Sequence, residues 1–156
     1  MKKAPKVLFF SRGSASRSQL AEGFLRSLAG DRFIPVSAGA DAPHVHPMAA
    51  EVMREAGIDI SAQKPREIAS LFRETFQCVI VLGDESRERY PVYPFTRRVF
   101  RWSVPDPEAA AGDPEARKQE FRKVRDEIRN KVEEFLATMG QAGGAVVPAS
   151  SYTAAA

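Results

Sequence analysis

The stretch 7–18, VLFFSRGSASRS, decides the fold, because it reads as a buried strand that runs through a small-residue loop into a helix. The apolar run 7–10 has the length and the continuous hydrophobicity of a buried parallel strand. After the loop 11–17, Leu20 and Phe24 recur at helical spacing. This order predicts an α/β fold with a ligand site at the carboxyl end of the first strand.

The loop 11–17 has the chemistry of an oxyanion site. Its small residues allow several backbone N–H groups to converge on one point, and the following helix N-terminus adds partial positive charge. The guanidinium of Arg17 can donate two parallel hydrogen bonds to an oxyanion. We expect phosphate, arsenate or a phosphorylated ligand to be bound by Ser11, Arg12, Gly13, Ser14, Ala15, Ser16, Arg17 and Ser18.

Strands and helices alternate along the rest of the chain. Further strand patterns occupy 32–38, 78–82 and 99–102, and Pro35 indicates that the second strand lies at a sheet edge. The first helix expected after that one begins at Pro47 and runs to Gly57, which is expected to be its C′ residue. Two more helices are expected at 65–72 and 113–139. This alternation predicts a parallel sheet with right-handed crossovers.

The chain resembles the low-molecular-weight tyrosine phosphatases and the related thioredoxin-coupled arsenate reductases. Four blocks in the family's order carry the resemblance, and they lie within 7–22, 36–61, 79–84 and 102–107. The second block, from Ser-Ala-Gly to Gly-Ile-Asp-Ile-Ser, looks more like the arsenate reductases. The resemblance implies an open four-stranded parallel sheet in the order 2-1-3-4, flanked by helices.

The chain consists of two segments that differ in composition. The phosphatase-like α/β domain is predicted to comprise residues 1–139. Residues 140–156 are small and uncharged, and they lack the apolar periodicity that packing requires. We therefore predict a disordered tail at 140–156.

Position 11 is the main departure from the family. The family's loop begins with a cysteine that attacks phosphorus or arsenic, whereas this loop begins with Ser11. The resemblance makes Arg17 an oxyanion ligand and Asp106 the general acid. A serine hydroxyl is far more basic than a thiol and needs a general base, which the family's layout does not provide from His44 or His46. We therefore expect a pseudoenzyme that binds oxyanions or a phosphorylated partner, with impaired catalysis.

Cysteine usage weighs against the redox branch of the family. The reductases need two further cysteines in and after the loop that follows the third strand, but the segment 83–91 contains none. Cys78 is the only cysteine of the chain, and a free cysteine on a strand is commonly buried and inert. Arsenate reduction is therefore the activity that the sequence supports least.

Several alternatives stay open. Ser11 could serve an active protein tyrosine phosphatase through an unfamiliar serine route, or it could be a Cys→Ser trapping substitution in an active phosphatase. Ser14 weakens the second alternative, because it replaces an asparagine usual in the family's loop and trapping would not require that change. A third alternative is a decayed loop with no ligand.

Composition narrows the classes of partner. At 156 residues the chain is long enough for one domain with a single core. A net charge of +3 with interleaved acids does not favour nucleic acid. No apolar run reaches the ~18 residues that span a bilayer, and the four-residue run after the basic start is too short for a secretory signal. We expect a cytoplasmic protein without metal or cofactor, with a phosphoprotein as one class of partner.

Overall fold

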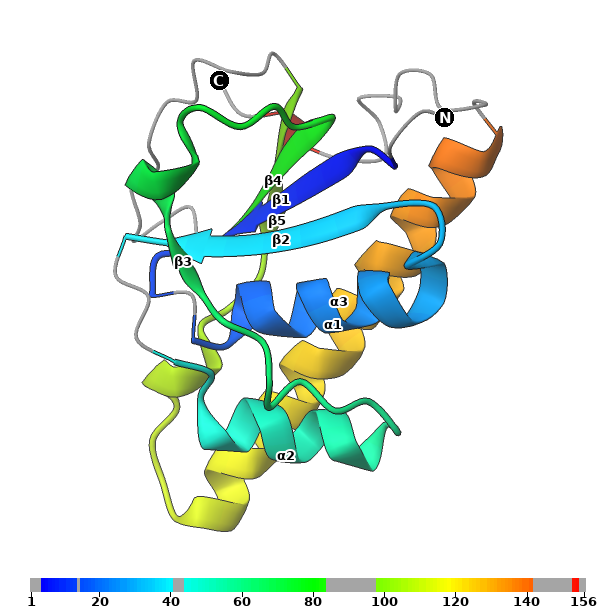
Figure 1. The fold of residues 1–156 in the computed structure, drawn as a ribbon. Helices are drawn as coiled ribbons and strands as arrows, with labels where there is room; N and C mark the ends of the chain where they lie inside the picture. Colours follow the sequence, from blue (N-terminus) through cyan, green and yellow to red (C-terminus); the bar gives the residue numbers. More distant parts are fainter. Residues whose placement is uncertain (1–3, 14, 41–43, 84–97, 142–152, 155–156) are drawn as a thin grey trace.

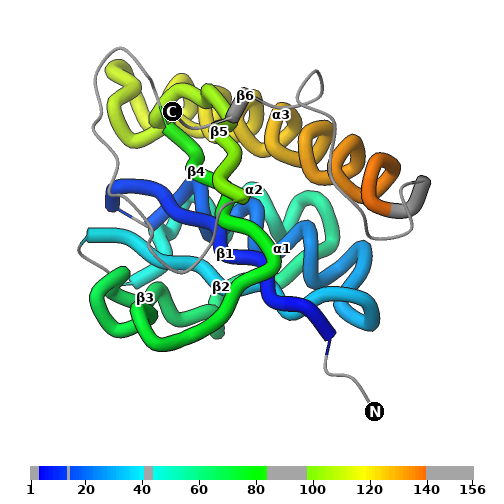
Figure 2. Tube along the Cα trace, turned by 90° about the horizontal axis from the view of Figure 1, so that it is seen from above, coloured from blue at the N-terminus to red at the C-terminus, as the bar shows by residue number. Residues whose placement is uncertain are grey.

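A computed structural model describes residues 4–13, 15–40, 44–83, 98–141 and 153–154 of the protein. The strands are β1 (Lys6–Phe10), β2 (Ile34–Gly39), β3 (Arg66–Glu67), β4 (Cys78–Gly83), β5 (Val99–Ser103) and β6 (Thr153–Ala154). They form one sheet in the order β3-β2-β1-β4-β5-β6, and Figure 2 shows the four longer strands side by side. β1 to β5 are parallel, and β6 is antiparallel to β5.

The three α-helices lie on one face of the sheet, below it in the view of Figure 1. They are α1 (Arg17–Ala29), α2 (Pro47–Glu55) and α3 (Pro114–Gln141), and two short 3₁₀ helices are η1 (Ile68–Leu71) and η2 (Pro107–Ala109). The larger core fills the space between this face and the helices. A smaller core on the opposite face gathers around Leu71 of η1 and Phe76.

Helical periodicity explains how α3 covers the sheet. The apolar stripe predicted for this helix is buried, and it consists of Phe121, Val124, Ile128, Val132, Phe135 and Met139. Charged side chains on the outer face pair with one another, as Arg129 does with Glu133. The helix thus behaves as an amphipathic element whose packing, more than its propensity, holds it in place.

A close helix contact depends on a glycine in α1. A Cβ atom at Gly23 would lie 2.6 Å from Cγ2 of Ile60, which is closer than side chains tolerate. The missing side chain therefore lets the segment after α2 pack directly against α1. This contact fixes α1, whose N-terminus receives the loop that follows β1.

The predicted α/β fold is confirmed, with additions at both edges of the sheet. The four predicted strands are β2, β1, β4 and β5, in the predicted order 2-1-3-4. The expectation that 65–72 forms a helix is wrong in part, because Arg66–Glu67 pairs with the end of β2 and only Ile68–Leu71 turns as a 3₁₀ helix. The expectation that the second strand is an edge strand is therefore wrong, because β3 lies outside β2. Pro35 tolerates this neighbour because β3 pairs only with Ala38 and Gly39, beyond the proline.

The end of α2 is confirmed, whereas the end of α3 differs from expectation. α2 ends at Glu55 with Ala56 as its C-cap, so Gly57 is the C′ residue, and it takes a positive φ of 81°, which glycine adopts without strain. α3 continues to Gln141, and β6 lies inside the stretch predicted to be a tail. The division into residues 1–139 and 140–156 stays a prediction. Within the described ranges, none of the helices has the length and hydrophobicity needed to cross a membrane.

Candidate functional site

The 11–17 loop leaves the carboxyl end of β1 and enters α1, as the sequence predicts. Its backbone is tied to the segments beside it. Three hydrogen bonds do this: Ser11 N to Ala38 O at 3.2 Å, Ala40 N to Arg12 O at 2.9 Å, and His46 N to Ala15 O at 2.8 Å. The shape of the loop therefore depends on main-chain atoms of β2 and of the α2 entrance. Ser14 lies outside the described residues.

Ser11 is buried at the start of the loop, with 1% of its surface exposed. Its Oγ donates to Oγ of Ser18 at 2.9 Å, and the backbone N–H of Ser18 donates to Ser11 Oγ at 3.2 Å. Ser18 is itself fully buried in the first turn of α1. The hydroxyl at position 11 thus pairs with another hydroxyl, which is too weak a base to take its proton.

Arg17 begins α1 and links the loop to a second segment. Its side chain is buried, and Nη1 donates to the carbonyl oxygen of Val104 at 3.1 Å. Val104 follows β5 and is itself held by a hydrogen bond from its N–H to Gly83 O at 3.0 Å. Arg17 thus holds the segment 104–108, which contains Asp106, against the loop.

Asp106 and Glu108 lie close together in the 104–108 segment. Asp106 caps η2, and its Oδ1 accepts a hydrogen bond from the N–H of Glu108 at 2.9 Å. The carboxylate of Glu108 in turn accepts a hydrogen bond from Oγ of Ser16 at 2.8 Å. Glu108 is not predicted from the sequence, because no local pattern indicates a contact with a residue 92 positions earlier.

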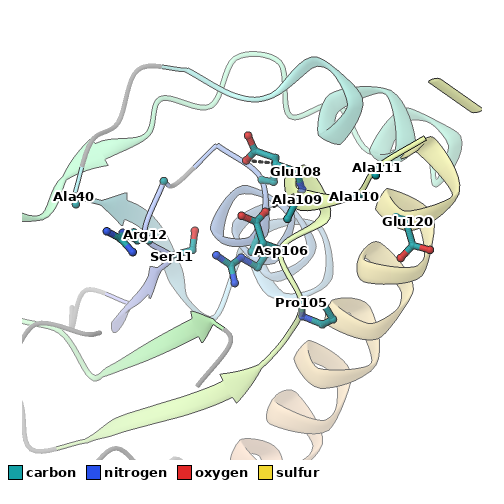
Figure 3. A pocket seen from close by; sticks show the side chains of 13 residues that line it. Ser11, Arg12, Ala40, Pro105, Asp106, Glu108, Ala109, Ala110, Ala111 and Glu120 are labelled. Carbon is teal, nitrogen blue, oxygen red and sulfur yellow. Dashed lines mark hydrogen bonds between the residues drawn. The ribbon is translucent and has the colours of Figure 1, made fainter. Parts of the chain in front are cut away.

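A cavity of about 930 Å³ opens between the loop and the 104–108 segment. Ser11 and Arg12 lie on one side of it, and Asp106 and Glu108 lie across from them (Figure 3). The predicted site residues that line it are Ser11, Arg12, Gly13, Ser16, Arg17 and Asp106. Ala15 and Ser18 support the loop from outside the lining. The structure thus brings cationic and acidic side chains to one hollow at the carboxyl end of β1.

A buried polar network supports α1 behind the loop. Nε2 of Gln19 donates to Oγ of Ser37 at 2.7 Å, and this hydroxyl donates to Oε1 of Glu22 at 2.7 Å. Glu22 also pairs with Arg26 at 2.8 Å. All three atoms of the Gln19–Ser37–Glu22 chain belong to buried residues, so the network fixes the first turns of α1 against β2.

Cys78 and His46 do not line the cavity. Cys78 is buried at the start of β4, where burial raises the pKa of its thiol to about 12. His46 caps α2, since its Nδ1 accepts a hydrogen bond from Met48 N at 3.1 Å. In the part of the chain that the structure describes, no cluster of three histidine, cysteine or acidic residues is placed to hold a metal ion.

A parallel sheet with a tethered small-residue loop after β1, a buried arginine and a facing acidic segment defines an α/β protein of the phosphatase type. The chain belongs to the low molecular weight phosphotyrosine protein phosphatase family, whose profile matches residues 6–144. The resemblance seen in the sequence is therefore confirmed. The family's nucleophile position holds Ser11, and Cys78 is the single cysteine.

The relatives of the chain include arsenate reductases. The arsenate reductase of Bacillus subtilis (strain 168) is 35% identical over 132 residues, which cover 85% of this chain and 95% of that protein. A solved arsenate reductase in an oxidized state is 32% identical with a TM-score of 0.73, and covers 85% of this chain and 97% of that one. Another, in a phosphate binding state, is 30% identical with a TM-score of 0.70 over the same shares of both chains.

Proposed function

We propose that this cytoplasmic protein binds tetrahedral oxyanions at the 11–17 loop, and that Ser11 leaves it catalytically impaired. The ligand is phosphate, arsenate or the phosphoryl group of a phosphorylated partner. The observation that carries the proposal is the buried Arg17 beside a tethered loop at the N-terminus of α1, open to a cavity. Backbone donors, a helix terminus and a forked cation suit a tetrahedral anion. A relative in a phosphate binding state supports the same chemistry.

The partner of Ser11 supports the impairment. Family catalysis needs a nucleophile that is ionised before the ligand arrives, and a loop of this kind can lower a cysteine pKa from ~8.5 to between roughly 3.5 and 7.5. Serine needs a base instead, and the hydroxyl of Ser18 does not supply one. Asp106, placed across the cavity, suits protonation of a leaving group, so it does not act as the base in the same step.

Serine favours binding for an electrostatic reason. A thiolate at position 11 would repel a dianion held in the loop, whereas the neutral hydroxyl of Ser11 can donate a hydrogen bond to it. The donors that remain, Arg17 and the loop amides, keep their full attraction. Loss of the nucleophile therefore lowers turnover without weakening the affinity of the loop.

A ligand titration tests the proposal. Thermal unfolding with phosphate, arsenate or vanadate should show stabilisation of ~2.7 kcal/mol at a hundredfold excess over Kd. Arg17→Ala should abolish this shift. Arg129→Ala removes an exposed arginine of α3 and serves as the matched control that keeps it. An equal shift in the Arg17→Ala protein would reject the site.

Arsenate reduction is a second candidate because relatives carry that name. The redox cycle needs several thiols, whereas Cys78 stands alone with a pKa of about 12. We therefore propose arsenate as a ligand and not as a substrate. With thioredoxin, thioredoxin reductase, NADPH and arsenate, the NADPH absorbance should fall no faster with the protein than without it.

A further inference from the structure

Ser16 has an unusual partner for a residue at the N-terminus of a helix. It occupies the N-cap of α1, where a serine oxygen ordinarily accepts a hydrogen bond from an N–H of the first turn. Here the side chain makes no capping bond, and its Oγ donates to Oε2 of Glu108 at 2.8 Å. Ser16 is 2% exposed, so this contact connects the buried loop to a carboxylate at the cavity wall.

The two ends of the 104–108 segment are both tied to the start of α1. Arg17 Nη1 holds the carbonyl of Val104 before Asp106, and Ser16 holds Glu108 after it. The N–H of Glu108 then donates to Oδ1 of Asp106. Asp106 therefore lies between two anchors that reach it from adjacent residues of the loop.

We propose that Glu108 is the positioning residue for Asp106, and that it acts through the hydroxyl of Ser16 to hold the 104–108 segment over the loop. The proposal rests on the proposed function, since the segment has this role only if the loop holds a phosphoryl group. Two side-chain anchors restrict a short segment more than one does, because the second contact limits the motion that the first still allows. Without Glu108, Arg17 is the described loop residue whose side chain still donates a hydrogen bond to this segment.

Misplacement of Asp106 should affect some substrates more than others, depending on the basicity of the leaving group. An acid at position 106 matters most when the leaving oxygen is strongly basic, because that oxygen must gain a proton as its bond to phosphorus breaks. A phenol with a pKa of ~10 depends on this proton, whereas a nitrophenol leaves readily as the anion. Misplacement of Asp106 therefore lowers turnover of phenyl phosphate more than turnover of 4-nitrophenyl phosphate.

Hydrogen exchange tests the anchor in the unaltered Ser11 protein. Amides of 104–110 should exchange severalfold faster in Ser16→Ala and in Glu108→Ala, and the double variant should add little to either change. Glu108→Gln should keep slow exchange, because its amide oxygen still accepts from Ser16. Glu120→Ala is the matched control, since this acid also lines the cavity but pairs with Lys123. Unchanged exchange in Glu108→Ala would overturn the proposal.

Kinetics in a Ser11→Cys background test the consequence. Glu108→Ala should lower kcat/KM for phenyl phosphate at least tenfold more than kcat/KM for 4-nitrophenyl phosphate. Asp106→Ala should show the same contrast, and Glu108→Gln should restore most of the rate. Equal losses on both substrates would reject the positioning role. If the Ser11→Cys protein has no turnover, the exchange result alone decides.

Vanadate-dependent melting separates the two proposals. A melting shift that persists in Glu108→Ala, together with unchanged exchange, rejects the role of Glu108 and leaves oxyanion binding intact. Absence of any shift in the unaltered protein rejects oxyanion binding itself. Faster exchange with a retained shift supports both.

Discussion

Positions 11 and 78 lie at opposite ends of two adjacent parallel strands, and they differ in what a sulfur atom would do there. Ser11 follows the carboxyl end of β1, and Cys78 begins β4 beside Val7. Both are buried, at 1% and 2% exposure. Position 11 faces Arg17 and the N-terminus of α1, whereas burial among apolar residues raises the pKa of Cys78 to about 12. We therefore expect the reactivity of a thiol at either position to depend on the donors around it more than on its depth of burial.

The largest effect we expect comes from moving a thiol into the favourable position. Ser11→Cys should raise hydrolysis of an aryl phosphate near pH 6 by several decades in kcat/KM, since loss of a covalent nucleophile can remove about six decades. Adding Asp106→Ala should lower it again. Fast turnover by the Ser11 protein would reveal a serine route. A Ser11→Cys protein that binds phosphate without turnover would show that more than the nucleophile has been lost.

Alkylation compares the two positions directly. In the Ser11→Cys protein, iodoacetamide should modify the introduced thiol at pH 7 at least a hundredfold faster than Cys78, because only thiolates react. Phosphate should protect the introduced thiol and leave Cys78 unaffected. Peptide mass spectrometry measures both rates in one sample. Similar alkylation rates at the two positions would contradict the expected difference in thiol pKa. Alkylation of Cys78 after unfolding in denaturant is the positive control.

Burial should also determine how much a polar contact outside the cavity contributes to the free energy of unfolding. Ser37→Ala removes the hydroxyl between Gln19 and Glu22, so it should lower the free energy of unfolding by about 1–3 kcal/mol, the usual range for buried groups left without a partner. Ser61→Ala makes the same change at an exposed bond to Asp59 and should have little effect. Urea unfolding of the two variants gives the contrast. Equal losses of unfolding free energy in the two variants would show that burial does not cause the difference.

The smallest effect belongs to the exposed ion pairs between α2 and α3. The side-chain hydrogen bond from Arg122 lowers the pKa of Glu55 from 4.5 to about 2. Because the folded pKa is depressed, this contribution to stability is present above about pH 4.5 and is lost as the pH falls toward 2. Glu55→Gln should lower Tm at pH 7 less than Ser37→Ala does, and the difference from the unaltered protein should vanish near pH 2. A larger loss at low pH than at neutral pH would contradict this sign.

The sequence predicts the parts of the fold that depend on local pattern. Continuous apolar runs identified β1 and β4, helical spacing identified α1 and α3, and the small-residue loop identified the position of the cavity. The 65–72 segment was misread because Ile68, Leu71 and Phe72 have helical spacing, whereas backbone pairing of Arg66–Glu67 with β2 determines its first residues. The spacing of apolar residues in a short segment does not indicate whether its backbone pairs with a distant strand.

The site was predictable only where its residues are contiguous. Ser11 to Ser18 form one stretch, and Asp106 came from the resemblance to the family. Glu108 and Ser37 were missed because their roles depend on contacts with Ser16 and Gln19, far away in sequence. A glutamate after Asp-Pro and a serine in a strand are common, so neither residue type indicates such a contact.

The backbone hydrogen bonds that hold the 11–17 loop have an evolutionary consequence. They use main-chain atoms of Ser11, Arg12 and Ala15, and these atoms are the same whatever side chain position 11 carries. Some serine codons differ from a cysteine codon by one nucleotide. A single mutation can therefore exchange serine and cysteine at position 11 without changing these backbone contacts. Under the proposed function, ligand capture and bond cleavage would therefore be inherited separately, and selection could act on one without the other.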